Sequence, residues 1–376
     1  MSKSRFAVAL AAVRDRIPGL SPHAYAPLEA ASATVDIAGS DEPRDTPWGR
    51  GIGDCFNNYR STPADARTSR LWGQYAPFFS VPSDIDPEVP SGCVVTFAQV
   101  LSRHGARDPT AYKTQVYNAT VAKIQAGATK FAHGYGFLKD LEYTLGADQL
   151  TQFGIQQMLD QGRVMAERYG HLVRDDDDDD DGSDGGSALP FSGPRARTAE
   201  EEYLAAILVV PETEGFNNTL DHGGCTEFEG GPDSQLGNRA RDAFADRFVP
   251  PVLRRLHEGL GASLHLTRDD VVAIMDLCPF YSVADPEGKL SDFCHLFTRD
   301  EWKSYDYYQS LGKYYGYGDG NPLGPTQGVG FVNELVARLT RRPVEDHTST
   351  NTTLTGSPRT FPSIARCTPT LATTTP

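Results

Sequence analysis

The sequence of 376 residues lacks any run approaching about 18 consecutive apolar residues, so it predicts no membrane-spanning helix. It also lacks a basic excess. The 35 lysines and arginines stand against 50 acidic residues, and the net charge of −15 argues against a nucleic-acid partner. No Cys-x-x-Cys pair occurs among the six cysteines, which favours disulfides in an oxidising compartment over a metal site. The length allows one large domain or two.

Some features point to a secreted protein. Lys3 and Arg5 precede an apolar run at 6–13, the order found in a signal peptide, although an amphipathic or disordered start fits equally well. Acceptor sequences for N-glycosylation begin at Asn118, Asn217 and Asn351. The sequence therefore favours secretion and leaves the oligomeric state undetermined.

A cluster of charged residues follows one predicted strand. Residues 94–101 are rich in β-branched and apolar residues and predict a buried strand, which a glycine and a proline then end. His104 lies just beyond it, between Arg103 and Arg107. Ligands of α/β proteins bind at the carboxyl ends of strands, arginine forks match phosphate oxygens, and an imidazole nitrogen can attack phosphorus. The cluster predicts a phosphate site, with an ordinary charged surface loop as the alternative.

The residues from Arg103 to Pro109 resemble the signature Arg-His-Gly-x-Arg-x-Pro of the histidine acid phosphatase family. Blocks at 71–79, 293–302 and 321–330 are similar to the fungal-type phytase branch of that family. The resemblance implies an α/β class with the histidine phosphatase, or phosphoglycerate-mutase-like, fold. In this fold a mixed-sheet α/β domain carries an inserted, smaller and mainly helical domain, and the active site lies between them.

The resemblance and the composition together divide the chain into segments. The expected divisions are a partly disordered lead-in at 1–68, an α/β domain at 69–130 and 320–362, a mainly helical insert at 131–319 and an aberrant tail at 363–376. The insert includes an acidic run and glycine-rich stretch at 175–187, which cannot bury apolar surface and is expected to be disordered, with calcium binding as the alternative.

The resemblance also implies a mechanism and a set of site residues. His104 would be the nucleophile of a phytase-type phosphomonoester hydrolase, with Arg103 and Arg107 on the phosphate. Gln74, Tyr75, Thr110 and Lys313 would line the site for phytate, myo-inositol hexakisphosphate. The chemistry needs neither a cofactor nor a metal. A general acid phosphatase is the alternative within the same family.

Local patterns predict several elements. Apolar residues recur at helical spacing from a threonine cap at Thr151, and this predicts a core-facing helix to 169. A second amphipathic stretch at 234–257 is expected to bend or split at its Pro250–Pro251 pair. Thr267 and Thr298 are each followed by an acidic residue three positions later, which indicates helix N-termini.

Cysteines and aromatic residues carry further expectations. By resemblance, Cys278 and Cys294 form a disulfide, whereas Cys93 and Cys225 have their partners beyond the last residue and are expected to be unpaired. The aromatic residues between Trp302 and Tyr317 are interpreted as packing.

The pattern of the family is broken at two places. Leaving-group protonation in the family comes from a late Ala-Asp-Phe-x-His-Asp-Asn segment, yet no His-Asp dipeptide occurs in this chain. The reversed pair Asp346-His347 is a weak substitute. The codons permitted at 363–376 can encode the family segment in a shifted frame, which indicates a frame error with late strands missing. A phosphate-binding arginine segment is likewise replaced at 189–197, where neither arginine matches the motif.

These breaks leave a second function open, that of a catalytically impaired phosphate-binding fragment. Asp108 is a further departure, since close relatives often have tyrosine there. A carboxylate at this position is expected to lower the local positive potential and to weaken the binding of a polyanion.

Overall fold

The computed structural model describes residues 68–79, 89–172, 210, 215–362 and 367–372. The lead-in, the acidic run and the segment at 189–197 lie outside these residues. The longer helices are α4 (Ala111–Gly127), α5 (Gln152–Tyr169), α8 (Leu236–Leu260), α9 (Arg268–Ala284), α10 (Arg299–Tyr317) and α11 (Val329–Thr340). The short elements are η4 (Gly73–Tyr75), η5 (Gly136–Lys139), η6 (Gly170–Leu172), η7 (His222–Gly224), α7 (Thr226–Gly230), η8 (Asp292–Leu296), η9 (Gly324–Gln327) and α12 (Thr352–Thr355). The strands are β1 (Ala98–Arg103) and β2 (Cys367–Ala372).

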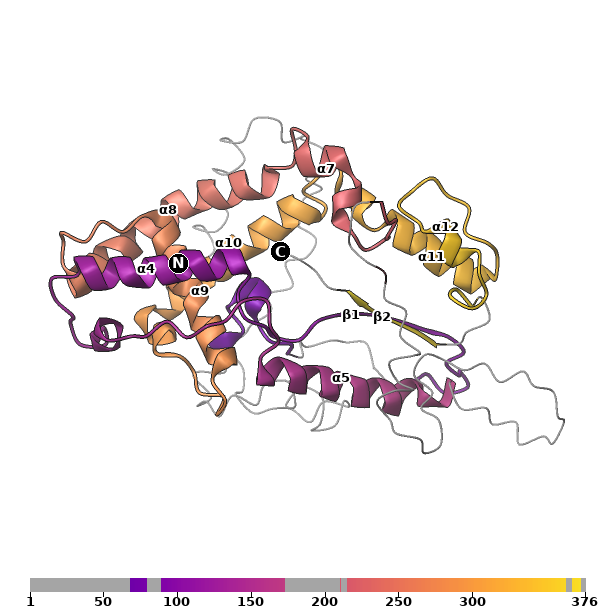
Figure 1. Ribbon diagram of the computed structural model, residues 1–376, viewed down its shortest axis with the longest axis horizontal. Coiled ribbons are helices and arrows are strands. Elements are labelled where there is room, and N and C mark those ends of the chain that lie inside the picture. Colours follow the sequence, from indigo (N-terminus) through magenta and orange to yellow (C-terminus); the bar gives the residue numbers. More distant parts are fainter. Residues whose placement is uncertain (1–67, 80–88, 173–209, 211–214, 363–366, 373–376) are drawn as a thin grey trace.

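Several of the longer helices gather at one end of the molecule, and the strands lie toward the other end (Figure 1). Helices α4, α8, α9 and α10 gather at one end, α7, α11 and α12 lie at the other, and α5 runs beneath β1 and β2. The main core belongs to the first group, where Trp72, Tyr117, Trp302 and Tyr305 are fully buried together. Because α4 packs on α9 within this core, residues on both sides of position 130 share it, and the predicted domain division stays a prediction.

Both predicted helix caps are confirmed. The Thr267 hydroxyl accepts a hydrogen bond from the backbone of Asp270, whose carboxylate accepts one from the Thr267 N–H. Thr298 and Glu301 form the same reciprocal pair at the start of α10. Each arrangement satisfies two backbone donors that a helix start leaves unpaired, so the local sequence determines where α9 and α10 begin.

The expected split at Pro250–Pro251 does not occur, because α8 continues through both prolines from Leu236 to Leu260, and the expected bend stays a prediction. A proline inside a helix removes a backbone hydrogen bond. Burial of Val249, Val252 and Leu256 on either side of the pair offsets this cost, since these side chains belong to the main core.

The two strands are parallel, with Ala98 opposite Cys367 and Arg103 opposite Ala372. The sheet of the described residues is therefore parallel and two-stranded, and the expected mixed sheet does not occur within it. The segment at 363–376 was expected to be an aberrant tail, yet six of its residues make β2. β1 begins four residues later than predicted and is not buried throughout, since Leu101 is half exposed.

Helix α5 confirms the predicted bounds and its threonine cap, since the Thr151 hydroxyl accepts from the Gly154 N–H at 3.0 Å. The expectation that its apolar face meets the core holds only in part. Ile155 and Leu159 on this helix are exposed.

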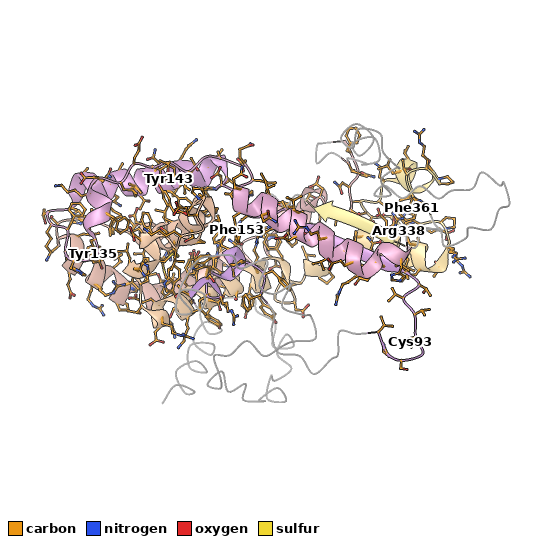
Figure 2. The ribbon with its side chains drawn as sticks, turned by 90° about the horizontal axis from the view of Figure 1, so that it is seen from below. Cys93, Tyr135, Tyr143, Phe153, Arg338 and Phe361 are labelled. Carbon is orange, nitrogen blue, oxygen red and sulfur yellow. A yellow bond between two sulfur atoms is a disulfide. The ribbon has the colours of Figure 1, made fainter. Side chains whose placement is uncertain are left out.

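The disulfide between Cys278 and Cys294 is confirmed and ties α9 to η8. Cys93 and Cys225 are free, as expected, and Figure 2 shows Cys93 on the segment that leads to β1, apart from the helices. At the other end of the chain Arg338 on α11 lies over the ring of Phe361, 3.7 Å from its centroid (Figure 2). None of the described helices is long and apolar enough to cross a membrane.

Candidate active site

The candidate site is the loop between β1 and α4. β1 ends at Arg103, and His104 is the first residue beyond the strand, as the sequence predicts. The loop ends at Thr110, whose hydroxyl accepts a hydrogen bond from the Lys113 N–H and so caps α4. The positively charged residues thus stand between the carboxyl end of a strand and the N-terminus of a helix, where backbone N–H groups favour anions.

The His104 ring is held in one tautomer. Its Nδ1 lies 2.7 Å from the carbonyl oxygen of Gly105. Since a carbonyl oxygen only accepts, Nδ1 carries the proton and Nε2 has the lone pair. Arg107 confirms this assignment, because its Nε donates to Nε2 at 3.3 Å. The nitrogen that faces the arginine is therefore the one that can act as a nucleophile.

Helix α5 supports the loop from below. A Cβ on Gly105 would overlap the backbone of Gly154, and a Cβ on Gly154 would overlap the backbone of Ala106. Ala106 is held on both sides: its carbonyl accepts from the Thr151 N–H at 3.0 Å, and its N–H donates to the Gln157 side chain at 2.8 Å. These contacts leave no room for a side chain at Gly105 or Gly154. They fix the part of the loop that directly follows His104.

Further positively charged residues lie around the loop. The pKa of Lys313, on α10, is lowered by burial and by the charges of Arg103 and Arg241. The pKa of Arg103 is lowered by burial and by Arg107. These effects show that the positive charges are near enough to repel one another, and an anion bound among them would relieve that repulsion. Lys313 and Arg103, both predicted site residues, are thus brought together.

Gln74 and Tyr75 form η4, which packs against α10. The pKa of Tyr75 is raised by burial and by the charge of Asp276, so its hydroxyl stays protonated. Its ring lies 4.9 Å from that of Phe280 on α9. The Tyr75 ring thus packs against α9.

Asp108 turns away from His104. Its carboxylate accepts a hydrogen bond from the Gly146 N–H, and burial raises its pKa despite that bond and the nearby Arg107. A second carboxylate, Asp148, is paired with Arg107 at 3.2 Å. Two acidic residues therefore stand beside one arginine of the site.

A buried cluster behind the site was missed by the sequence analysis. Asp276 is 1% exposed and accepts hydrogen bonds from the hydroxyls of Tyr117 and Tyr305 and from the amide of Gln309, while Lys113 pairs with it at 3.4 Å. The signal in the sequence was one aspartate inside an otherwise apolar helical stretch, which indicates a buried charge with partners.

The reversed pair Asp346-His347 lies elsewhere, after α11. Burial acts to raise the pKa of Asp346, but hydrogen bonds from Asn333, Thr348 and Thr350 hold it below the ordinary value. A carboxylate stabilised in its ionised form is a poor proton donor. Asp346 therefore organises its own loop.

The predicted glycosylation sites lie outside the candidate active site and stay predictions. Asn118 is exposed on α4, and Asn217 is exposed and donates to the Thr350 carbonyl. Asn351 caps α12 with its side chain.

Comparison with known proteins agrees with this geometry. The family model of the histidine phosphatase superfamily (branch 2) matches residues 94–181 and 197–373. Phytase A of Aspergillus fumigatus is 48% identical over 320 residues, covering 81% of this chain and 67% of the relative. Phytase A of Aspergillus oryzae is 46% identical over 311 residues, covering 78% of this chain and 66% of the relative.

The fold agrees as well. The crystal structure of the phytase from D. castellii matches with a TM-score of 0.56 at 18% identity, covering 84% of this chain and 69% of that one. The chain spans about two thirds of the length of the curated relatives it matches.

Proposed function

From the membership of this chain in branch 2 of the histidine phosphatase superfamily, we propose that it transfers phosphate from phosphate monoesters to His104, as a hydrolase of the phytase type. One observation carries the proposal. The His104 Nδ1–H donates to the Gly105 carbonyl, which leaves the Nε2 lone pair facing the guanidinium of Arg107. A phosphate held by that guanidinium places phosphorus next to the nucleophile.

The reaction has two steps. In the first, the Nε2 lone pair forms a bond to phosphorus while the bond from phosphorus to the leaving oxygen breaks. In the second, water attacks phosphorus, the P–N bond breaks, and the electron pair returns to Nε2. Arg103 and Arg107 offset the charge that develops on the phosphate oxygens. Lys313, Gln74, Tyr75 and Thr110 line the space around a phosphorylated inositol ring.

The protonation of the leaving oxygen limits which phosphate esters can react. An alkoxide, such as that of an inositol, needs a proton as it departs, and the chain has no His-Asp pair to supply it. A nitrophenolate departs without a proton. We therefore expect the chain to react faster with activated aryl phosphates than with phytate. The second candidate function, a phosphate-binding protein with little turnover, rests on the same missing pair.

The test uses 2,4-dinitrophenyl phosphate with the full chain in a stopped-flow instrument, followed by an acid-free quench and detection of phosphohistidine. The expected result is a burst of dinitrophenolate with a stoichiometric phosphohistidine in the wild type. The matched control His104→Ala should give neither. A folded wild-type chain without a burst would refute the enzyme proposal. Phosphate release from phytate, measured separately, distinguishes a phytase from an enzyme that only accepts activated esters.

We also propose that the protein is secreted. The Cys278–Cys294 disulfide supports an oxidising compartment, and exposure of Asn118 and Asn217 suits glycosylation.

A further inference from the structure

Asp148 has an unusual backbone conformation beside the active-site loop. Its φ of 58° lies in the left-handed region, which residues other than glycine rarely adopt. Hydrogen bonds on both sides hold it there. The Asp148 N–H donates to the Pro109 carbonyl at 2.9 Å, the Asp108 N–H donates to the Gln149 carbonyl at 2.8 Å, and Arg107 forms an antiparallel bridge with Leu150. A strained residue fixed by its neighbours is a sign of a functional constraint.

The Asp148 carboxylate joins two parts of the site. Its Oδ1 accepts from NH1 of Arg107 at 3.2 Å, and its Oδ2 accepts from the Ala111 N–H at 2.9 Å. Ala111 is the first residue of α4, so the second contact lies at a helix start. The backbone contacts hold Asp148 in place, and its carboxylate has one contact on α4 and one on the arginine.

The arginine is oriented by this contact. NH1 of Arg107 donates to both the Asp148 carboxylate and the Asp108 carbonyl, the latter at 2.9 Å. Nε, on the opposite edge of the guanidinium, points to Nε2 of His104. The edge formed by Nε and NH2 is the fork for two phosphate oxygens, once an incoming phosphate replaces the His104 lone pair as the acceptor of the Nε–H. Holding NH1 therefore turns this fork toward the place where phosphorus must lie.

We propose that Asp148 is a positioning residue, which orients the Arg107 guanidinium so that its phosphate-binding edge faces the His104 nucleophile. The inference rests on the proposed function of the loop and adds a residue to it. The pair contributes little to stability, because the Asp148 side chain is 49% exposed, and exposed ion pairs are weak. Its effect lies in orientation, where small displacements have large consequences for rate.

Another account of Asp148 predicts the opposite sign. A carboxylate near Arg107 could merely offset its positive charge. Its removal would then tighten the binding of phosphate and leave the rate unchanged. The positioning account predicts weaker binding and a slower first turnover. The two accounts are therefore separated by one substitution that removes the charge but keeps the size, Asp148→Asn.

The second contact of Asp148 needs its own control. Ala111→Pro removes the N–H that binds Oδ2 and leaves the Arg107 contact intact. Proline is accepted at the first position of a helix, and the preceding Thr110 has φ −60° and ψ 157°, the extended conformation that proline requires before it. This variant thus tests whether Asp148 acts through α4 alone.

Two measurements on the full chain decide the question: the first-turnover rate with 2,4-dinitrophenyl phosphate and the Kd of inorganic phosphate by calorimetry. We expect Asp148→Asn to slow the first turnover about tenfold or more and to raise the Kd about threefold or more, as a displaced fork would. Ala111→Pro should stay within about twofold of the wild type in both, since the Arg107 contact remains.

The proposal is overturned if Asp148→Asn binds phosphate as tightly as the wild type or more tightly, or if Ala111→Pro reproduces its losses. A wild type that binds phosphate without a burst of dinitrophenolate contradicts the proposed enzyme activity only. The Kd comparison then still decides the role of Asp148. Circular dichroism and thermal unfolding confirm that each variant is folded.

Discussion

The buried carboxylate of Asp276 is the feature whose removal should cost most stability. Every group around it is a donor: the hydroxyls of Tyr117 and Tyr305, the amide of Gln309 and the ammonium of Lys113. Four donors thus converge on one carboxylate. Because the side chain is 1% exposed, water does not replace these hydrogen bonds when one is lost.

The magnitude follows from the contacts. A hydrogen bond to a charged group contributes about 1.5–3 kcal/mol, and two tyrosine hydroxyls bind this carboxylate directly. Asp276→Asn keeps one acceptor oxygen and turns the other into a donor, so one hydroxyl loses its acceptor. We expect a loss of about 3 kcal/mol in the free energy of unfolding, measured by urea denaturation with the disulfide intact.

Two controls assign the loss to the buried contacts. Lys113→Met removes the ion pair at the exposed side, where the lysine side chain is 41% exposed, and should cost less than about 1 kcal/mol. Tyr305→Phe removes one hydroxyl and keeps the ring. In a double-mutant cycle with Asp276→Asn it should show a coupling of about 1 kcal/mol or more. An Asp276→Asn variant within about 1 kcal/mol of the wild type would refute the reasoning.

Two predictions concern charge at the site. Because burial and two arginines lower the pKa of Lys313 from its usual 10.5, the unfolded chain binds more protons between the two values, and stability rises with pH there. Phosphate binding should weaken as pH rises through the lowered pKa of Lys313, because the lysine then loses its charge. In a calorimetric pH series, Lys313→Arg should abolish this loss of affinity. An unchanged loss in the variant would contradict the role of Lys313 in binding phosphate. Asp108→Tyr, which removes a carboxylate near Arg107, should lower the Michaelis constant for phytate in a version of the protein that hydrolyses it; an unchanged constant would show that Asp108 does not affect binding.

Local signals were enough to predict some parts of the structure. The helix starts at Thr267 and Thr298 follow from the residues within one turn, because the cap and its partner are three positions apart. The place of His104 just after a strand follows from the end of an apolar run. In each of these cases the deciding interactions lie within the same short segment.

The features that could not be predicted from the sequence depend on contacts between residues far apart along the chain. The Pro250–Pro251 pair stays helical because side chains from other elements bury its neighbours, and no local pattern records them. Asp276 gathers Tyr117 and Tyr305 from positions 159 and 29 residues away. Asp148 reaches Arg107 across 41 residues, which no local pattern records. Contacts of this kind become visible only in the folded chain.

The geometry separates the capture of phosphate from the expulsion of the alcohol. Capture needs Arg103, His104 and Arg107, and contacts from α5 and from Asp148 fix this loop. Expulsion of an alkoxide needs an acid beside the leaving oxygen. The two carboxylates nearest the loop are poorly suited to it, because Asp148 is paired with Arg107, and Asp108 is turned to the Gly146 N–H. The ratio of aryl to alkyl phosphate turnover therefore measures how much of the reaction the loop performs alone, and a ratio near unity would mean that another group supplies the proton.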